Sequence, residues 1–211
     1  YSELTFHHWF WKNLLEKKNN NLWIGFCQKR RFWLQSKNSS DNLLSKVPSN
    51  WKNYNAVICK KINLGKPKLS KLFKRGWKNI IQKPSILYSD RNYNIELHFD
   101  LFHGFRNLQK AAELVKKEDR DEFIEYIKKN RSFNPHIMCI AKPKILKLWF
   151  KDLFPWLKRC EAIFGFKDLK GYDTTRLYAY LAERYHSFWF KKYSNYVEWP
   201  YKFIDTEKIK N

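Results

Sequence analysis

Two adjoining runs near the start of the chain indicate its fold: Leu22-Trp23-Ile24-Gly25-Phe26-Cys27 and, directly after it, Gln28-Lys29-Arg30-Arg31. The first run is short and apolar, which is typical of a buried strand. Two further runs of the same kind follow at Tyr54–Cys59 and His136–Ala141. Because helical patterns separate the three runs, we predict an α/β fold with a mixed sheet of short buried strands flanked by helices.

Helices are predicted wherever apolar residues recur at helical spacing, and they make the C-terminal half of the chain helix-rich. Pro143 suits the first turn of one helix, and Gly165 suits its end. Pro155 lies inside that helix and should kink or divide it. The predicted helices cover residues 3–17, Asn107–Lys129, 143–164 and 174–193.

Composition excludes a disordered basic tail, because 18% of the residues are aromatic and 44% are hydrophobic. A chain of 211 residues can form one domain with a packed core, and we predict a single domain over residues 1–211. Its formal net charge of +22 would attract phosphates, nucleic acid or anionic lipid headgroups. The basic residues are mainly lysine, 32 against 10 arginines, so compositional drift from AT-rich coding is a second explanation for part of the charge.

Half of the net charge is concentrated in one stretch. No acidic residue lies between Asn42 and Ser89, whereas eleven lysines and arginines do. Glycine and proline punctuate this stretch, so we predict an irregular insertion with one short helix near Ser70–Trp77. It is either a solvated loop or a basic flank that faces lipid headgroups or a polyanionic acceptor.

The cysteines and the hydropathy pattern indicate a reduced, cytosolic protein. Cys27, Cys59, Cys139 and Cys160 are dispersed without metal-ligand spacing, which is typical of buried free thiols. No run of 18 apolar residues is present, so we predict no membrane-spanning helix, and no signal peptide is recognisable.

Segments from both ends of the chain resemble one family. They are Glu3-Leu4-Thr5 with Trp11-Lys12-Asn13, the run that ends in Arg30-Arg31-Phe32, the block Pro135–Ile140, and the stretch from Arg176 to Glu183-Arg184. Their order and spacing are similar to those of bacterial polysaccharide-assembly glycosyltransferases long classed as a domain of unknown function. Some members are assigned as galactofuranosyltransferases for capsule and O-antigen. The resemblance covers nearly the whole chain.

This resemblance implies a GT-A-like domain that moves a hexosyl unit, with galactofuranose as the expected sugar. The donor would be a nucleoside-diphosphate sugar, and the acceptor a surface polysaccharide or a lipid-linked glycan. The expected location is cytoplasmic, with peripheral association at the inner, anionic face of the membrane. Family members begin with a further strand and loop, so we expect this sequence to be an N-terminally incomplete copy.

Arg30 and Arg31 are the candidates for binding the donor diphosphate. They follow the first predicted strand, and ligands of open α/β sheets bind at the carboxyl ends of strands. A guanidinium also matches phosphate oxygens in a bidentate manner. The alternative is an ordinary surface pair.

The remaining site candidates come from the motifs that carry the resemblance. Glu183 and Glu3 are the candidate catalytic carboxylates, because an inverting transferase needs a base for the acceptor hydroxyl. For Glu183 and Arg184 the alternative is a structural ion pair, and for His103 a structural histidine. The residues assigned to substrate binding besides the two arginines are Thr5, His103, Arg176 and Arg184.

No cofactor is predicted, and metal independence is favoured. Many GT-A enzymes hold a divalent ion with an Asp-x-Asp at a strand end, but the only such triplet here is Asp119-Arg120-Asp121. We predict that it lies on an exposed helix as a solvated charge cluster. The basic side chains after the first strand could neutralise the diphosphate instead.

The chain departs from the family pattern at several positions. The family has His-Tyr where this sequence has Gln28-Lys29, and Asn where it has Ile137; Ala179 and Ala182 replace Gly and Ser. One alternative is therefore a catalytically degenerate scaffold. Another is a basic, aromatic-rich RNA-binding or ribosome-associated protein, although no RNA-binding motif is recognisable.

Overall fold

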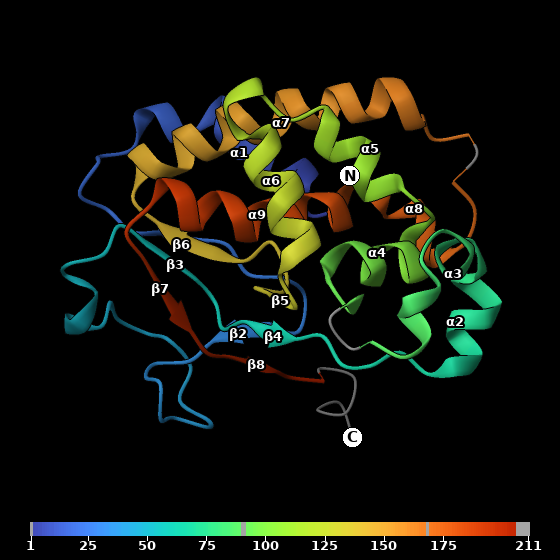
Figure 1. Ribbon diagram of the computed structural model, residues 1–211. Coiled ribbons are helices and arrows are strands. Elements are labelled where there is room, and N and C mark those ends of the chain that lie inside the picture. The colour runs from blue at the N-terminus through green and yellow to red at the C-terminus, as the bar shows by residue number, and fades with distance from the viewer. Residues whose placement is uncertain (1, 90–91, 168, 206–211) are drawn as a thin grey trace. The chain divides into compact units, whose positions relative to one another are not determined.

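The computed structural model describes residues 2–89, 92–167 and 169–205, and its helices and strands confirm the predicted α/β class (Figure 1). The chain divides into two units. Of the described residues, the sheet unit contains 3–61, 134–151 and 186–205. The helical unit contains Ile62–Phe133 and Asp152–Tyr185, together with Ser2. Two long helices contribute residues to both units, and the prediction of a single domain stays a prediction.

The sheet unit is built on a mixed four-stranded sheet. Its order is β1 (Ile24–Gly25), β6 (Cys139–Ala141), β3 (Ala56–Cys59) and β7 (Tyr196–Trp199). β3 pairs antiparallel with β6 and parallel with β7. Every residue of β3 and β6 is buried, which is why both strands read as continuous apolar runs. The three predicted strands are confirmed, although each is shorter than its apolar run.

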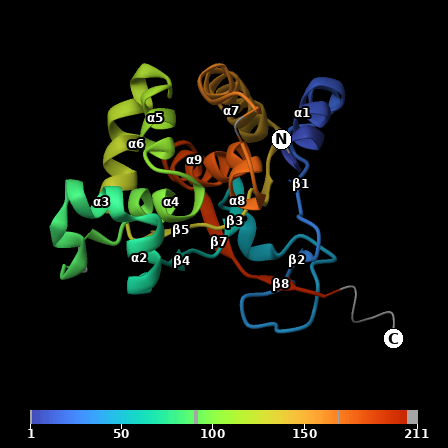
Figure 2. The same cartoon turned by 90° about the vertical axis from the view of Figure 1, so that its right-hand side faces the viewer.

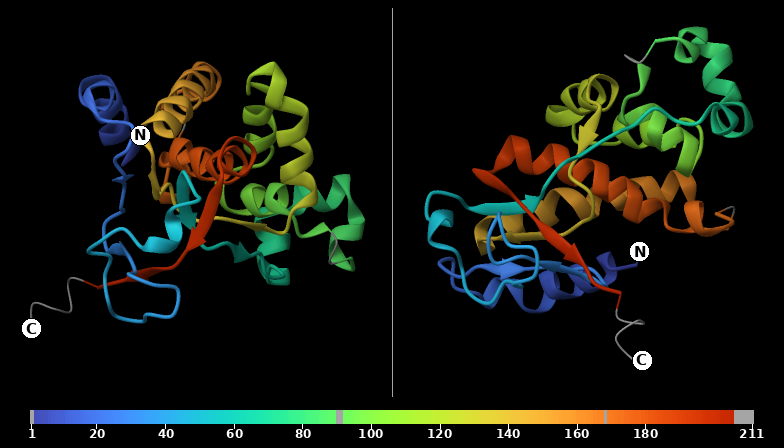
Figure 3. Two further views of the ribbon diagram at one scale, coloured as in Figure 1. Left: turned by 90° about the vertical axis from the view of Figure 1, so that its left-hand side faces the viewer. Right: turned by 90° about the horizontal axis from the view of Figure 1, so that it is seen from below.

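The segment that follows the last helix is rich in aromatic residues and forms two strands that were not predicted, the first of which is β7. After β7, Pro200 interrupts the strand, and β8 (Tyr201–Phe203) pairs antiparallel with β2 (Arg31–Trp33) (Figure 3). Proline cannot donate to a ladder, so one sheet ends there and the next begins. The indole of Trp199 donates to the carbonyl of Leu34 at 2.7 Å and fixes this corner.

Helix α1 (Leu4–Asn13) covers the first part of the helix predicted for residues 3–17, and a 3-10 turn at Leu15–Lys17 follows it. Its His7 is buried against Phe26, with ring centroids 4.3 Å apart. Burial lowers the pKa of His7 to about 4, so this imidazole is neutral at pH 7. A further 3-10 turn lies at Ser49–Trp51.

The helical unit contains a short antiparallel pair of strands, β4 (Ile62–Asn63) and β5 (Ser132–Phe133), with several helices between them in the sequence. The short helix predicted near Ser70–Trp77 is confirmed as α2 (Leu69–Arg75), and a second helix that was not predicted, α3 (Trp77–Gln82), follows it. A 3-10 turn (Pro84–Leu87) and the unpredicted α4 (Ile95–His103) follow. The core of this region consists of Leu72, Ile86, Tyr93, Leu97 and Leu101.

The helix predicted over Asn107–Lys129 is two helices, α5 (Asn107–Glu113) and α6 (Lys117–Lys129), which lie beside one another in Figure 2. Glu118 and Asp119 stand in the first turn of α6, where the helix dipole favours acidic side chains, so a new helix begins there. The prediction that the Asp119-Arg120-Asp121 triplet is solvated is wrong for Asp119. Its carboxylate is fully buried and accepts from the hydroxyl of Tyr185 at 3.3 Å.

Helix α7 (Pro143–Phe164) begins and ends where the sequence predicts, with Pro155 inside it. Gly165 follows with φ of 57°, a left-handed value that glycine favours. The last predicted helix is interrupted at Arg176, which separates α8 (Tyr172–Thr175) from α9 (Leu177–Tyr193). None of the helices in the described ranges is long and apolar enough to cross a membrane.

All four cysteines are free. Cys59, Cys139 and Cys160 are buried, as the sequence predicts, whereas Cys27 is exposed, so the prediction of a buried thiol is wrong there.

Gly76 fixes the junction between α2 and α3. A Cβ at this position would lie 2.6 Å from Cδ2 of Leu101 and 2.9 Å from the carbonyl oxygen of Leu72. We expect Gly76→Ala to lower the free energy of unfolding by about 1–3 kcal/mol, since backbone must shift to relieve the clash. Urea unfolding measures this. The control Gly65→Ala, whose Cβ would have no neighbour within 4 Å, should not be destabilised; equal losses in both variants would contradict the argument.

Candidate functional site

The candidate residues fall into two groups, one in each unit. In the sheet unit, Arg31 is the first residue of β2, and Arg30 lies in the turn before it with φ of 66°. The sequence predicted that the pair directly follows the first strand. The pair stands instead at the start of β2, several residues after the end of β1. Nη1 of Arg30 lies 3.8 Å from the carboxylate of Asp205, and the Arg31 guanidinium lies 5.6 Å from the centre of the Phe203 ring.

Glu3 reaches the same turn from the start of α1. Its carboxylate accepts a hydrogen bond from the side-chain amide of Gln28, two residues before Arg30. Gln28 is one of the positions that differ from the family pattern, and this contact was not predicted. Thr5 lies on the first turn of α1 and is exposed. The group combines two guanidinium groups with a carboxylate, which suits a phosphate and a hydroxyl.

In the helical unit, Arg184 is a buried charge on α9, with only 2% of its side chain exposed. Its Nη1 donates to the carboxylate of the neighbouring Glu183. The guanidinium carbon lies 3.8 Å from the centre of the Phe133 ring and 5.6 Å from that of Phe99. Burial lowers the pKa of Arg184, and the charge of Glu183 opposes that shift.

His98 on α4 completes the surroundings of Arg184, and sequence reasoning missed it. Its Nδ1 lies 3.4 Å from Nη2 of Arg184. Burial and then the Arg184 charge lower the pKa of His98 to about 3, so the imidazole is neutral at pH 7. Because arginine can only donate, Nδ1 is the acceptor and Nε2 carries the proton.

Tyr180 brings together two further predicted residues. The ring of His103 stacks on the ring of Tyr180 with centroids 3.8 Å apart. The guanidinium of Arg176 lies 5.7 Å from the centre of the same ring, and its Nη2 donates to Ser2 at 3.2 Å. Glu183 and Arg184 lie on α9, Arg176 directly precedes it and His103 ends α4, so four of the eight predicted site residues lie in the helical unit, on or next to these two helices.

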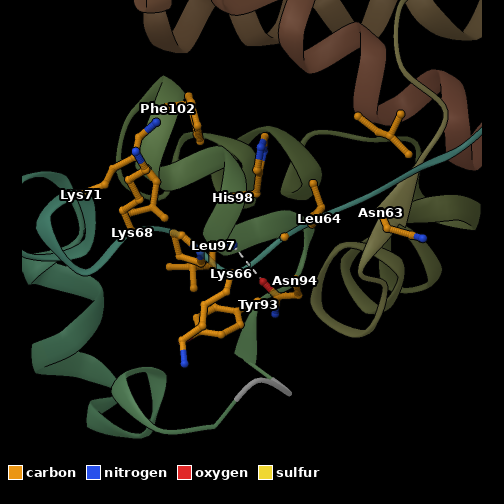
Figure 4. A pocket seen from close by; sticks show the side chains of 14 residues that line it. Asn63, Leu64, Lys66, Lys68, Lys71, Tyr93, Asn94, Leu97, His98 and Phe102 are labelled. Atoms are coloured by element: carbon orange, nitrogen blue, oxygen red, sulfur yellow. Dashed lines mark hydrogen bonds between the residues drawn. The ribbon is translucent and has the colours of Figure 1, made fainter.

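A pocket of about 370 Å³ opens beside this group in the helical unit, and His98 lines it (Figure 4). Leu64, Leu97 and Leu101 give it an apolar wall. Three lysines also line it: Lys66 and Lys68 from the segment that leads into α2, and Lys71 from α2 itself. All fourteen lining residues are described, and none of them is acidic.

Few polar groups in this pocket could form hydrogen bonds with a base or a sugar. Both ends of the Asn94 amide are already used, since Oδ1 caps α4 at the amide of Leu97 and Nδ2 donates to the carbonyl of Lys128. The ammonium of Lys71 lies 3.0 Å from the centre of the Phe102 ring. The pocket therefore suits an anionic group attached to an apolar or aromatic part.

Within the described residues, no three histidines, cysteines or carboxylates gather closely enough to hold a metal ion. The arginines and lysines of the two groups are the available counter-charges for a phosphate.

Comparison with known proteins places these residues in a family. The sequence matches the family described as "Domain of unknown function (DUF4422)" over residues 1–195. This chain belongs to the DUF4422 family. Every predicted site residue of this DUF4422 chain lies inside the matched range.

The fold of this DUF4422 chain is similar to that of WbbM, a bifunctional glycosyltransferase solved in its apo form, with a TM-score of 0.65 and 16% sequence identity. The similarity covers 98% of this chain but 37% of WbbM, so the chain spans little more than a third of that protein. No curated protein matches the sequence. At this identity the match establishes the fold, which agrees with the predicted glycosyltransferase-type α/β architecture.

The pairing of Glu183 with Arg184 can be tested by removing one charge. We expect Glu183→Gln to lower the free energy of unfolding by about 3 kcal/mol, because it leaves a buried guanidinium without its carboxylate. The control Glu125→Gln breaks an exposed ion pair with Lys129 on α6 and should cost less than about 0.5 kcal/mol. Urea unfolding of both variants measures the difference, and similar losses would count against a buried ion pair.

Proposed function

We propose that this DUF4422 chain transfers a hexosyl unit, galactofuranosyl in the first instance, from a nucleoside-diphosphate sugar to a growing capsule or O-antigen glycan or its lipid-linked form. The observation that supports the proposal most is the similarity of 98% of the chain to a bifunctional glycosyltransferase. Membership of the DUF4422 family and the resemblance of the terminal motifs to polysaccharide-assembly transferases support it further.

Arg30 and Arg31 would stabilise the charge that develops on the leaving diphosphate. Two guanidinium groups in one turn can provide this stabilisation without a metal ion, since they offer fixed donors to phosphate oxygens. If the reaction inverts the sugar, Glu3 or Glu183 would accept the proton of the acceptor hydroxyl. Thr5, His103, Arg176 and Arg184 would bind substrate hydroxyls or phosphates.

The pocket lined by Lys66, Lys68 and Lys71 would hold an anionic part of a substrate, because its lining has positive charge and an apolar wall but no carboxylate. We place the protein at the cytoplasmic face of the membrane as a peripheral protein, where surface-glycan acceptors are elongated. The acid-free basic stretch supports this location, since each lysine near an anionic surface contributes about 1 kcal/mol.

Binding of nucleoside-diphosphate sugars tests the function. Saturation-transfer spectra and thermal shifts recorded against a panel of these donors should identify at least one ligand, and release of the diphosphate should depend on a glycan acceptor. Arg30→Ala and Arg31→Ala should each weaken donor binding by about 2–5 kcal/mol if the contact is a desolvated charge pair.

The control for that experiment is Lys18→Ala, which removes an exposed positive charge elsewhere in the sheet unit. It should leave donor affinity unchanged. Unchanged affinity in both arginine variants would remove the assigned role of the pair. RNA binding without any response to nucleotide sugars would favour the RNA-binding alternative.

We also expect transfer to continue in EDTA. Arg30 and Arg31 are proposed to neutralise the diphosphate, so chelation should change the rate little. The measurement is acceptor-dependent diphosphate release with and without EDTA. Complete loss that manganese or magnesium restores would show that carboxylates of this chain hold a required metal.

A further inference from the structure

Helices α2 and α3 expose a row of large apolar side chains. Leu69 and Phe73 lie one turn apart on α2, and Trp77 and Ile81 lie one turn apart on α3. They are 54%, 59%, 51% and 70% exposed. Single exposed apolar residues are common, but four large ones at intervals of four residues along two adjoining helices are unusual, and exposed apolar surface of this kind marks interaction sites. We name these four residues the α2–α3 face.

Basic side chains flank the α2–α3 face along the same two helices. They are Lys74, Arg75 and Lys78, with Lys83 just after α3, whereas Lys68 and Lys71 line the pocket described above. No acidic residue lies within the whole range 42–89. Apolar residues interspersed with lysines, without carboxylates, are typical of a helix that lies in the headgroup layer of a membrane.

The exposure of the face does not result from loosely attached helices. Leu72 of α2 is fully buried, and Gly76 packs against Leu101 of α4. The amide of Asn79 on α3 donates to the buried carboxylate of Asp100, also on α4. Leu72, Gly76 and Asn79 thus attach the two helices to the rest of the helical unit. The four residues of the α2–α3 face occupy other positions of the same helices and are exposed.

We propose that the α2–α3 face binds the surface of an anionic bilayer. Phe73 and Trp77 would enter the headgroup layer, where amphipathic indole rings are favoured, and the flanking lysines would contact lipid phosphates. A second copy of the chain would bring its own basic residues and repel the first. A nucleic acid would match the charge but would leave Leu69 and Ile81 uncovered, since neither can stack on a base.

This inference deepens the proposed function, because it names the residues that would hold the transferase at the site of a membrane-bound acceptor. It also goes further than the alternative stated from the sequence, in which the basic stretch only faces lipid headgroups. Membrane affinity should now depend on the apolar row as well as on the lysines.

Flotation with phosphatidylcholine vesicles that contain increasing phosphatidylglycerol tests the proposal. Phe73→Ser/Trp77→Ser should weaken binding roughly tenfold or more. The variant loses the favourable free energy of transferring two partly exposed aromatic side chains from water into the headgroup layer. The matched control is Phe6→Ser/Trp9→Ser, which removes the same residue types at 57% and 50% exposure in the sheet unit. We expect that control to bind vesicles like the unmodified protein, and urea unfolding verifies that each variant is folded.

The contribution of the lysines to binding and the depth to which Trp77 enters the bilayer are tested separately. Lys74→Gln/Lys78→Gln should weaken binding, whereas Lys17→Gln/Lys18→Gln, with the same loss of charge at exposed positions in the sheet unit, should not. Brominated lipids should quench indole fluorescence, and Trp77→Phe should retain vesicle binding while losing most of that quenching. Retention of the quenching in Trp77→Phe would overturn insertion of this residue.

Other outcomes would also overturn the proposal. They are equal effects of the two aromatic double variants, binding that ignores the phosphatidylglycerol content, and a dimer or an RNA complex that only Phe73→Ser/Trp77→Ser dissociates. Transfer to a water-soluble acceptor separates this inference from the proposed function. Transfer without vesicle binding counts against the membrane surface alone, and vesicle binding without transfer counts against the transferase alone.

Discussion

A buried guanidinium is the constraint on which the helical unit depends. A charge as buried as that of Arg184 must be compensated, since an unpaired buried ion costs several kcal/mol. Glu183 supplies the opposite charge, the rings of Phe99 and Phe133 cover the guanidinium, and His98 accepts from it. These partners come from α9, α4 and β5. One side chain therefore fixes how three elements of the unit meet, and it also places His98 in the wall of the lysine-lined pocket.

The parts of the fold that could be predicted are those in which a single local sequence pattern points to one kind of secondary structure. The apolar run Ala56–Cys59 is buried along its whole length, and no helical period competes with it. Helix α7 has a proline at its first position and a glycine after its last. The break between α5 and α6 was missed because apolar residues continue through it at helical spacing, and the acidic first turn of α6, with Glu118 and Asp119, was not recognised as the start of a new helix. Strands β7 and β8 were missed because aromatic residues suit helices and strands alike.

The candidate site was predictable to the extent that its residues belong to short motifs. Glu183 and Arg184 were found as a pair because a charged pair on an apolar helix needs partners, and the structure supplies the identity of those partners. His98 was not found, since its role depends on a contact with a residue 86 positions away. Likewise, nothing local connects Glu3 with Gln28, and their hydrogen bond exists only because α1 returns to the turn before β2.

The number of lysines does not distinguish a membrane-binding role from a coding bias in the composition. A coding bias towards lysine and asparagine would scatter positive charge over any solvated surface, and +22 on this chain is compatible with that origin. The same bias does not explain why Leu69, Phe73, Trp77 and Ile81 are each more than half exposed on two helices that Leu72, Gly76 and Asn79 attach to the rest of the helical unit. Exposed apolar area raises the free energy of the isolated protein in water, and drift towards polar residues would remove it. The apolar row, and not the charge around it, is therefore the feature that distinguishes a membrane-binding surface from a solvated loop.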